Sequence, residues 1–136
     1  MECIQYIVVR KDLVPTMGVG KTAAQVAHAS MAAVCGRDDI LTMRGFSSII
    51  IDNPNVIEWF QGPFGKLVVY VKTRQKLLNL AQKLDEQGIH HKMIWDACRT
   101  SLEPEEKDGT TLTCMGVEPM RRDKVPKCLA KLQLLD

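Results

Sequence analysis

The chain has 136 residues, and its composition is close to the globular average, with 46% hydrophobic and 25% charged residues. These values exclude a fibrous or wholly disordered chain, and this length allows one domain, over residues 1–136, to bury an ordinary core. The net charge is only +2, so any binding of nucleic acid must depend on a local basic patch.

The five cysteines are widely spaced and contain no C-x-x-C pair, which argues against disulfide and zinc frameworks. The first residues, MECIQYIVVR, already have the composition of a strand rather than of a signal peptide. Every apolar run falls well short of the roughly 18 residues that a membrane span needs. The sequence therefore predicts a reduced, soluble, cytoplasmic protein that holds no metal ion and binds no membrane.

The first half of the chain begins with a strand and a helix. Residues 4–9 are mostly apolar at both alternating sets of positions, as in a central strand covered on both faces. The Ala-rich stretch from Gly20 to about Cys35 predicts a helix. Within 36–65, GRDD at 36–39 indicates a helix end, FSSIIID suits either a short strand or a helical turn, and PNVIEWF predicts a helix begun by proline.

The second half alternates strands and helices. Residues 66–72 predict a strand, and Thr73 is a typical N-cap for the helix that follows. The next strand ends at Asp96, and a strand, helix and strand joined so closely predict a right-handed parallel crossover. After a polar loop at 99–109, we expect the strand TLTCMGV, a basic helix from about Arg122 and a short last strand, LQLL.

The order of these elements predicts an α/β fold. We expect a single three-layer domain, in which a small mixed, mostly parallel sheet has helices on both faces.

Lys21, Gln25 and His28 lie on one face of the first predicted helix, whose other residues are small and apolar. Such a stripe can be a solvated face. A solvated face usually mixes Glu, Lys and Arg, however, so one Lys, one Gln and one His at a helix start favour a ligand site.

The segment PTMGVGKT follows a strand and is similar to a phosphate-binding loop. Pro15 stands where that motif needs its first glycine, and proline offers no amide hydrogen to a phosphate. A weaker form of the hypothesis remains, in which Gly18, Gly20 and the helix start bind one phosphate or carboxylate through free amides.

Asp96 ends a predicted strand and Thr100 follows shortly after, at the carboxyl edge where open α/β sheets place ligands. This carboxylate is a candidate general base, although an aspartate here can also cap the next turn. Thr113 adds a hydroxyl, but threonine is also a common strand residue. No histidine stands near Cys98 in sequence to activate its thiol, which argues against a nucleophilic cysteine.

A basic segment follows the last long strand. Arg121, Arg122 and three lysines place five positive charges against one negative charge in eleven residues. Such a segment can contact a phosphate backbone, or it can be a solvated helix end.

Taken in order, these segments resemble the type II peptidyl-tRNA hydrolases. YIVVRKDL, GKTAAQVAHAS, DACRT and TLTCMGVEP are similar to that family's first strand, its G-K-x-A-A-Q-x-A-H-A helix, its D-A-G-x-T turn and its T-x-x-x-G-I-G-P strand. The resemblance covers most of residues 4–136, and its first motif is specific. It implies a small mixed sheet with helices on both faces.

The resemblance implies hydrolysis of the ester that joins a peptide to the 3′ ribose of tRNA, with no cofactor. The partner is then peptidyl-tRNA, and a homodimer is compatible with the family. The implied catalytic residues are Lys21, Asp96, Thr100 and Thr113. The residues predicted to bind substrate are Gly20, Gln25, His28, Arg121 and Arg122.

Four features depart from the family pattern. Cys98 and Glu118 replace glycines, which permit positive φ or a close approach of the backbone to substrate. The stretch 36–65 is longer, and so is an acidic loop that carries Glu103, Glu105, Glu106 and Asp108. An alternative function is therefore a non-catalytic module of this fold that binds RNA or protein. The presence of both Lys21 and Asp96 favours the enzyme.

Overall fold

The computed structural model describes residues 2–35 and 40–136. Its main sheet has the order β4–β1–β6–β5, and β7 also pairs with β1. β4 is parallel to β1, β6 and β7 are antiparallel to β1, and β5 is antiparallel to β6. β1, β4 and β5 therefore run in one direction, which confirms the predicted mixed sheet. The strands are β1 (Cys3–Arg10), β4 (Gly65–Val71), β5 (His91–Asp96), β6 (Thr111–Val117) and β7 (Met120–Arg121).

The central strand β1 is buried along its whole length, as its apolar sequence predicts. Because side chains alternate along a strand, Ile7 and Val9 belong to the core on one face, whereas Ile4 and Val8 belong to the core on the other.

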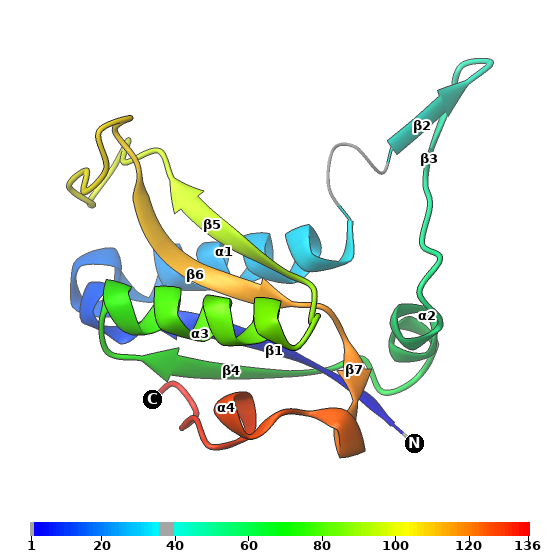
Figure 1. The fold of residues 1–136 in the computed structure, drawn as a ribbon. Coiled ribbons are helices and arrows are strands. Elements are labelled where there is room, and N and C mark those ends of the chain that lie inside the picture. The colour runs from blue at the N-terminus through cyan, green and yellow to red at the C-terminus, as the bar shows by residue number, and fades with distance from the viewer. Residues whose placement is uncertain (1, 36–39) are drawn as a thin grey trace.

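Helices cover both faces of the sheet (Figure 1). α1 (Val14–Val34) packs across β1, β5 and β6 on one face. α3 (Arg74–Glu86) and the short α4 (Lys127–Ala130) contribute Leu77 and Leu129 to the core on the other face. The α/β class with three layers is thus confirmed.

α1 contains a break. Gly18 has φ 75° and ψ 175°, outside the helical region, and it separates a first turn from the longer helix. Glycine adopts such a positive φ without the cost that a Cβ imposes. The helix predicted from Gly20 is therefore present, and it begins just ahead of Lys21.

The stretch 36–65 contains a hairpin and a helix. β2 (Ile40–Met43) and β3 (Phe46–Ile49) pair in an antiparallel hairpin that projects from the body (Figure 1). FSSIIID is therefore partly a strand, and every residue of the two strands is exposed. The predicted helix α2 (Pro54–Gln61) is confirmed, and the Asn53 side chain caps it. The helix end predicted at 36–39 lies outside the described residues.

The elements predicted for the second half are confirmed through β6. Thr73 caps α3 by accepting a hydrogen bond from the Lys76 amide. α3 connects β4 to β5, which run in the same direction as the predicted crossover requires. However, β1 and β6 lie between these two strands, so the sequence predicted the connection but not the strand order.

Two predictions for the C-terminal segment are wrong. Instead of a continuous basic helix, one 3-10 turn at Arg122–Lys124 is followed by extended backbone and the four-residue α4. Pro126 explains the interruption, since proline forces the preceding residue out of helical geometry. The predicted last strand, LQLL, is reduced to an isolated bridge between Leu134 and Val69.

Candidate active site

The predicted polar residues of α1, β5 and β6 meet at the end of the sheet where β5 finishes. Asp96 is the last residue of β5, and Thr113 lies on the neighbouring strand β6. A register shift between Ile94 and Trp95 alters the pairing of these strands just ahead of Asp96. α1 crosses both strands, which places Lys21 and Gln25 over the strand ends.

The carboxylate of Asp96 accepts hydrogen bonds from three directions. Lys21 Nζ lies 3.1 Å from Oδ2 in an ion pair, and the Cys98 amide donates to the same oxygen at 2.9 Å. Gln25 Nε2 donates to Oδ1 at 3.2 Å. An ionised carboxylate has about four acceptor positions, so roughly one remains for a water molecule or a substrate group.

Lys21 connects the carboxylate to Thr100. Its ammonium donates to Thr100 Oγ1 at 2.6 Å, and its side chain is 17% exposed against 15% for that of Asp96. An ammonium group has three donors, and Asp96 and Thr100 use two of them. The third can bind an oxygen that approaches from solvent.

Thr113 orients the Gln25 side chain. Its hydroxyl lies 2.6 Å from Gln25 Oε1, and both residues are buried. Because the hydroxyl donates to the amide oxygen, the amide nitrogen of Gln25 is left to donate to Asp96. Thr113 therefore reaches the carboxylate only through Gln25.

Comparisons with known proteins identify the family of the chain. The model of the family described as Peptidyl-tRNA hydrolase PTH2 matches residues 3–135. The chain belongs to this family. A peptidyl-tRNA hydrolase of Haloquadratum walsbyi is 35% identical over 130 residues, covering 96% of this chain and 97% of the relative. One from Thermoplasma acidophilum is 34% identical over 129 residues, or 95% of each chain. One from Methanopyrus kandleri is 34% identical over 131 residues, covering 96% of this chain and 97% of the relative.

Cys98 departs from the family's D-A-G-x-T pattern at a position where the backbone favours glycine. Its φ is 58°, in the left-handed region, where a Cβ costs about 1–2 kcal/mol. This backbone aims the Cys98 amide at Asp96 Oδ2. Of the two reasons for a glycine that the sequence left open, a positive φ or a close approach to substrate, the structure shows the positive φ, and the cysteine adopts it under strain.

Glu118 replaces a second glycine of the family pattern without such strain. Among the described residues, the non-glycine positions with positive φ are Arg44, Phe64 and Cys98. The Glu118 carboxylate accepts a hydrogen bond from Asn53 Nδ2 at 2.6 Å. It thus ties the start of α2 to the end of β6, far from Asp96.

The sequence did not indicate Arg10, which holds the acidic loop through Glu105. Its guanidinium is almost fully buried and binds Asp12, Glu105 and the Leu112 carbonyl. Burial opposes its charge, but the hydrogen bonds that it donates to Asp12 and Glu105 raise the pKa of Arg10 above its ordinary value. A charged residue within an apolar strand was the one available signal, because such a group needs partners.

Some predicted substrate-binding residues lie outside this cluster. His28 and Gly20 are exposed on α1, and within the described residues no hydrogen bond joins His28 to Asp96 or Lys21. Arg121 pairs with the start of β1, whereas Asp96 lies at the edge where β1 ends. The length of β1 separates the two edges by about 23 Å.

Several of the acidic and basic residues at the two ends of the sheet form ion pairs. Arg121 forms an ion pair with Asp123 and Arg122 one with Glu2, while Arg74 binds Glu106 of the acidic loop.

Other kinds of site find little support in the described part of the chain. Over 2–35 and 40–136, no three His, Cys, Asp or Glu side chains gather as metal ligands would. In the same residues, no helix has the length and apolar character that would let it cross a membrane. Burial raises the pKa of the Cys114 thiol beneath α1 to about 12, which keeps it protonated and unreactive.

Proposed function

We propose that this chain hydrolyses peptidyl-tRNA by attack of an activated water on the ester carbonyl. The water oxygen bonds to the carbonyl carbon, the bond to the ribose oxygen breaks, and the products are a free peptide acid and the 3′ hydroxyl of tRNA. The observation that carries the proposal is the convergence of Lys21, Thr100 and Asp96 at one solvent-accessible point.

Each residue has a role that follows from its contacts. The free acceptor position of Asp96 holds the attacking water and takes its proton, as a general base does. The third N–H of Lys21 stabilises the negative charge that develops on the carbonyl oxygen, or holds the terminal phosphate. Thr100 fixes Lys21. Gln25 and Thr113 are positioning residues, because they act through the carboxylate.

Four exposed residues, two near this cluster and two distant from it, are proposed substrate contacts. Gly20 and His28 lie on α1 on either side of Lys21 and Gln25. Arg121 and Arg122 lie at the other edge of the sheet, where they can reach only RNA distant from the ester.

We further propose a cytoplasmic location and a homodimer. A light-scattering mass of twice 15.3 kDa would establish the dimer.

Substitution of the two charged residues tests the function. Lys21→Ala and Asp96→Asn should each lower turnover of peptidyl-tRNA by about 10²-fold or more, because each removes charge that the transition state needs. The double variant should lose much less than the product of the two losses, since the residues act as a unit. The measurement is release of free tRNA under single-turnover conditions.

A control variant separates the charge effect from a folding effect. Lys92→Ala removes an exposed lysine of β5 that does not contact Asp96, and it should retain the wild-type rate. Thermal unfolding should be similar in all the variants. Wild-type turnover by both site variants would refute the assignment, and a wild type that binds tRNA without cleaving it would identify a binding module.

A further inference from the structure

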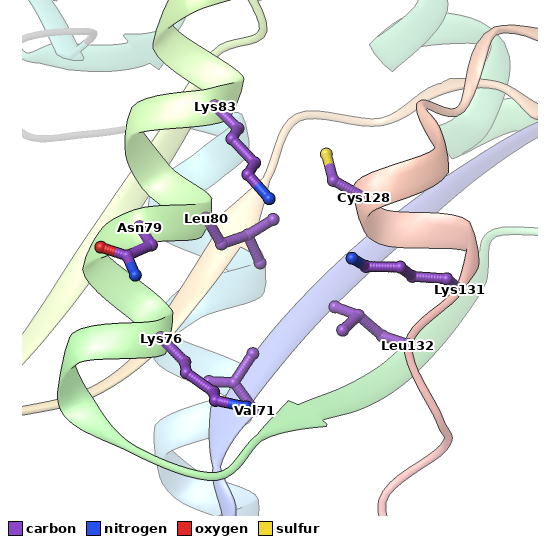
Figure 2. A pocket seen from close by; sticks show the side chains of 8 residues that line it. All are labelled: Val71, Lys76, Asn79, Leu80, Lys83, Cys128, Lys131 and Leu132. Atoms are coloured by element: carbon purple, nitrogen blue, oxygen red, sulfur yellow. The ribbon is translucent and has the colours of Figure 1, made fainter.

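A second basic site lies between α3 and α4, on the face of the sheet opposite α1. Its cavity has a volume of about 270 Å³, an apolar floor of Val71, Leu80 and Leu132, and a rim that includes Lys76, Lys83 and Lys131. Figure 2 shows Lys83 reaching from α3, and Lys131 from the residue just after α4, toward the space between the two helices. We call this site the lysine cavity.

The lysine cavity continues along the sheet edge into a second hollow of about 270 Å³, which shares Lys76 and Lys131 and adds Lys72. In the part of the chain that the structure describes, no carboxylate lines either hollow. Among the described residues, these four lysines form no ion pair, whereas Arg10, Arg74, Arg121 and Arg122 all do. Convergent ammonium groups repel one another unless an anion lies between them.

The lysine cavity opens near the same sheet edge as the active site. Val71 ends β4 and Asp96 ends β5, and these strands run in one direction. Three strand spacings separate β4 from β5, which is about 14 Å across the sheet. A few nucleotides of extended single strand cover such a distance around the edge.

We propose that the lysine cavity binds backbone phosphates of the RNA substrate a few nucleotides upstream of the ester, an inference that rests on the proposed hydrolysis at Lys21 and Asp96. Two connected hollows with four separate ammonium groups suit a chain of phosphates better than a single phosphate. The 3′ end then passes over the sheet edge, and its ester enters the active site.

Binding of a deacylated tRNA to the double variant Lys83→Gln/Lys131→Gln tests the inference. These side chains are exposed, so the fold should persist. The slope of log affinity against log salt should flatten by about 0.7 to 0.9 for each lysine that contacts a phosphate. The matched control, Arg44→Gln/Lys92→Gln, removes two exposed charges outside both hollows, and it should keep the wild-type slope.

A short substrate distinguishes this inference from the proposed function. An N-acetyl-aminoacyl ester of adenosine is too short to reach the lysine cavity. The Lys83→Gln/Lys131→Gln variant should therefore cleave this ester with the wild-type kcat/KM. The KM of the same variant for full peptidyl-tRNA should rise. A wild-type salt slope for tRNA binding by that variant would overturn the inference without contradicting the proposed hydrolysis at Lys21 and Asp96. The inference would also be overturned if the two lysines were needed for binding of pyrophosphate but their substitution did not change the affinity for tRNA. If the wild type cleaved neither the adenosine ester nor peptidyl-tRNA, the proposed hydrolysis would be refuted. The salt slope of tRNA binding would still show whether the lysine cavity binds phosphates.

Discussion

At the scale of single residues, the site depends on how each polar atom of Asp96 is satisfied. Sequence spacing alone placed Lys21 and Gln25 on one helix face and Asp96 at a strand end, because helical and strand periods are local properties. It did not reveal that Thr113 fixes the Gln25 amide or that Arg10 anchors the acidic loop. Those contacts join residues that are distant in sequence, so no local pattern contains them.

Cys98 gives a prediction at this scale. Cys98→Gly should stabilise the protein by about 0.5–1 kcal/mol, because relief of about 1–2 kcal/mol at positive φ exceeds the added backbone entropy of the unfolded glycine. Turnover should be equal or higher, since the Cys98 amide still reaches Asp96. Urea denaturation and single-turnover hydrolysis are the measurements.

Two controls accompany this prediction. Cys35 has φ −151°, so Cys35→Gly relieves no strain and should destabilise the protein. Cys98→Ser should retain activity, because a water mechanism needs no thiol. If Cys98→Ser abolished turnover while stability and tRNA binding persisted, the thiol itself would be catalytic.

At the scale of elements, α1 lies directly against β6. A Cβ added to Gly116 would lie 2.0 Å from the Ala29 carbonyl oxygen and 2.6 Å from its carbon, so only glycine allows this approach. The sequence predicted that both elements exist, because their apolar patterns are strong and local. It could not predict the strand order, which depends on contacts between distant segments. The interrupted C-terminal helix had a local signal in Pro126, which the predicted continuous helix did not take into account.

The substitution Gly116→Ala tests this packing. The substitution should destabilise the fold by about 2–3 kcal/mol or more, since the helix backbone must move to relieve the overlap. It should also lower turnover, because α1 carries Lys21 and Gln25 to Asp96. Gly20→Ala is the stability control: its Cβ would meet nothing within 4 Å, and alanine favours a helix by up to about 1 kcal/mol. Equal stability of the two variants would show that α1 does not lie against Gly116.

At the scale of the whole molecule, residues 121–131 form a basic path with five positive charges and one negative charge. The segment from β7 through α4 runs from the N-terminal end of β1 toward the end of β4 (Figure 1). It carries Arg121 and Arg122 at its start and Lys131 at its end. The net charge of +2 hides this asymmetry, and the composition could only exclude dependence on bulk charge. A double-stranded stem that lay along this path would direct its 3′ strand toward the edge that holds Asp96.

Removal of the two arginines tests this path at its far end. Arg121→Gln/Arg122→Gln should flatten the salt dependence of tRNA binding by about 0.7 to 0.9 for each phosphate that an arginine neutralises in the wild type. Their ion pairs with Asp123 and Glu2 do not prevent such binding, because exposed pairs contribute only about 0–1 kcal/mol.

The opposite change, Glu2→Gln/Asp123→Asn, frees both guanidinium groups and should tighten the binding of tRNA at low salt. Distant sites act independently, so the flattening should add to that of Lys83→Gln/Lys131→Gln when the four substitutions are combined. An unchanged slope in the arginine variant would show that Arg121 and Arg122 only hold the N-terminal edge together, and that the RNA contacts the lysine end alone.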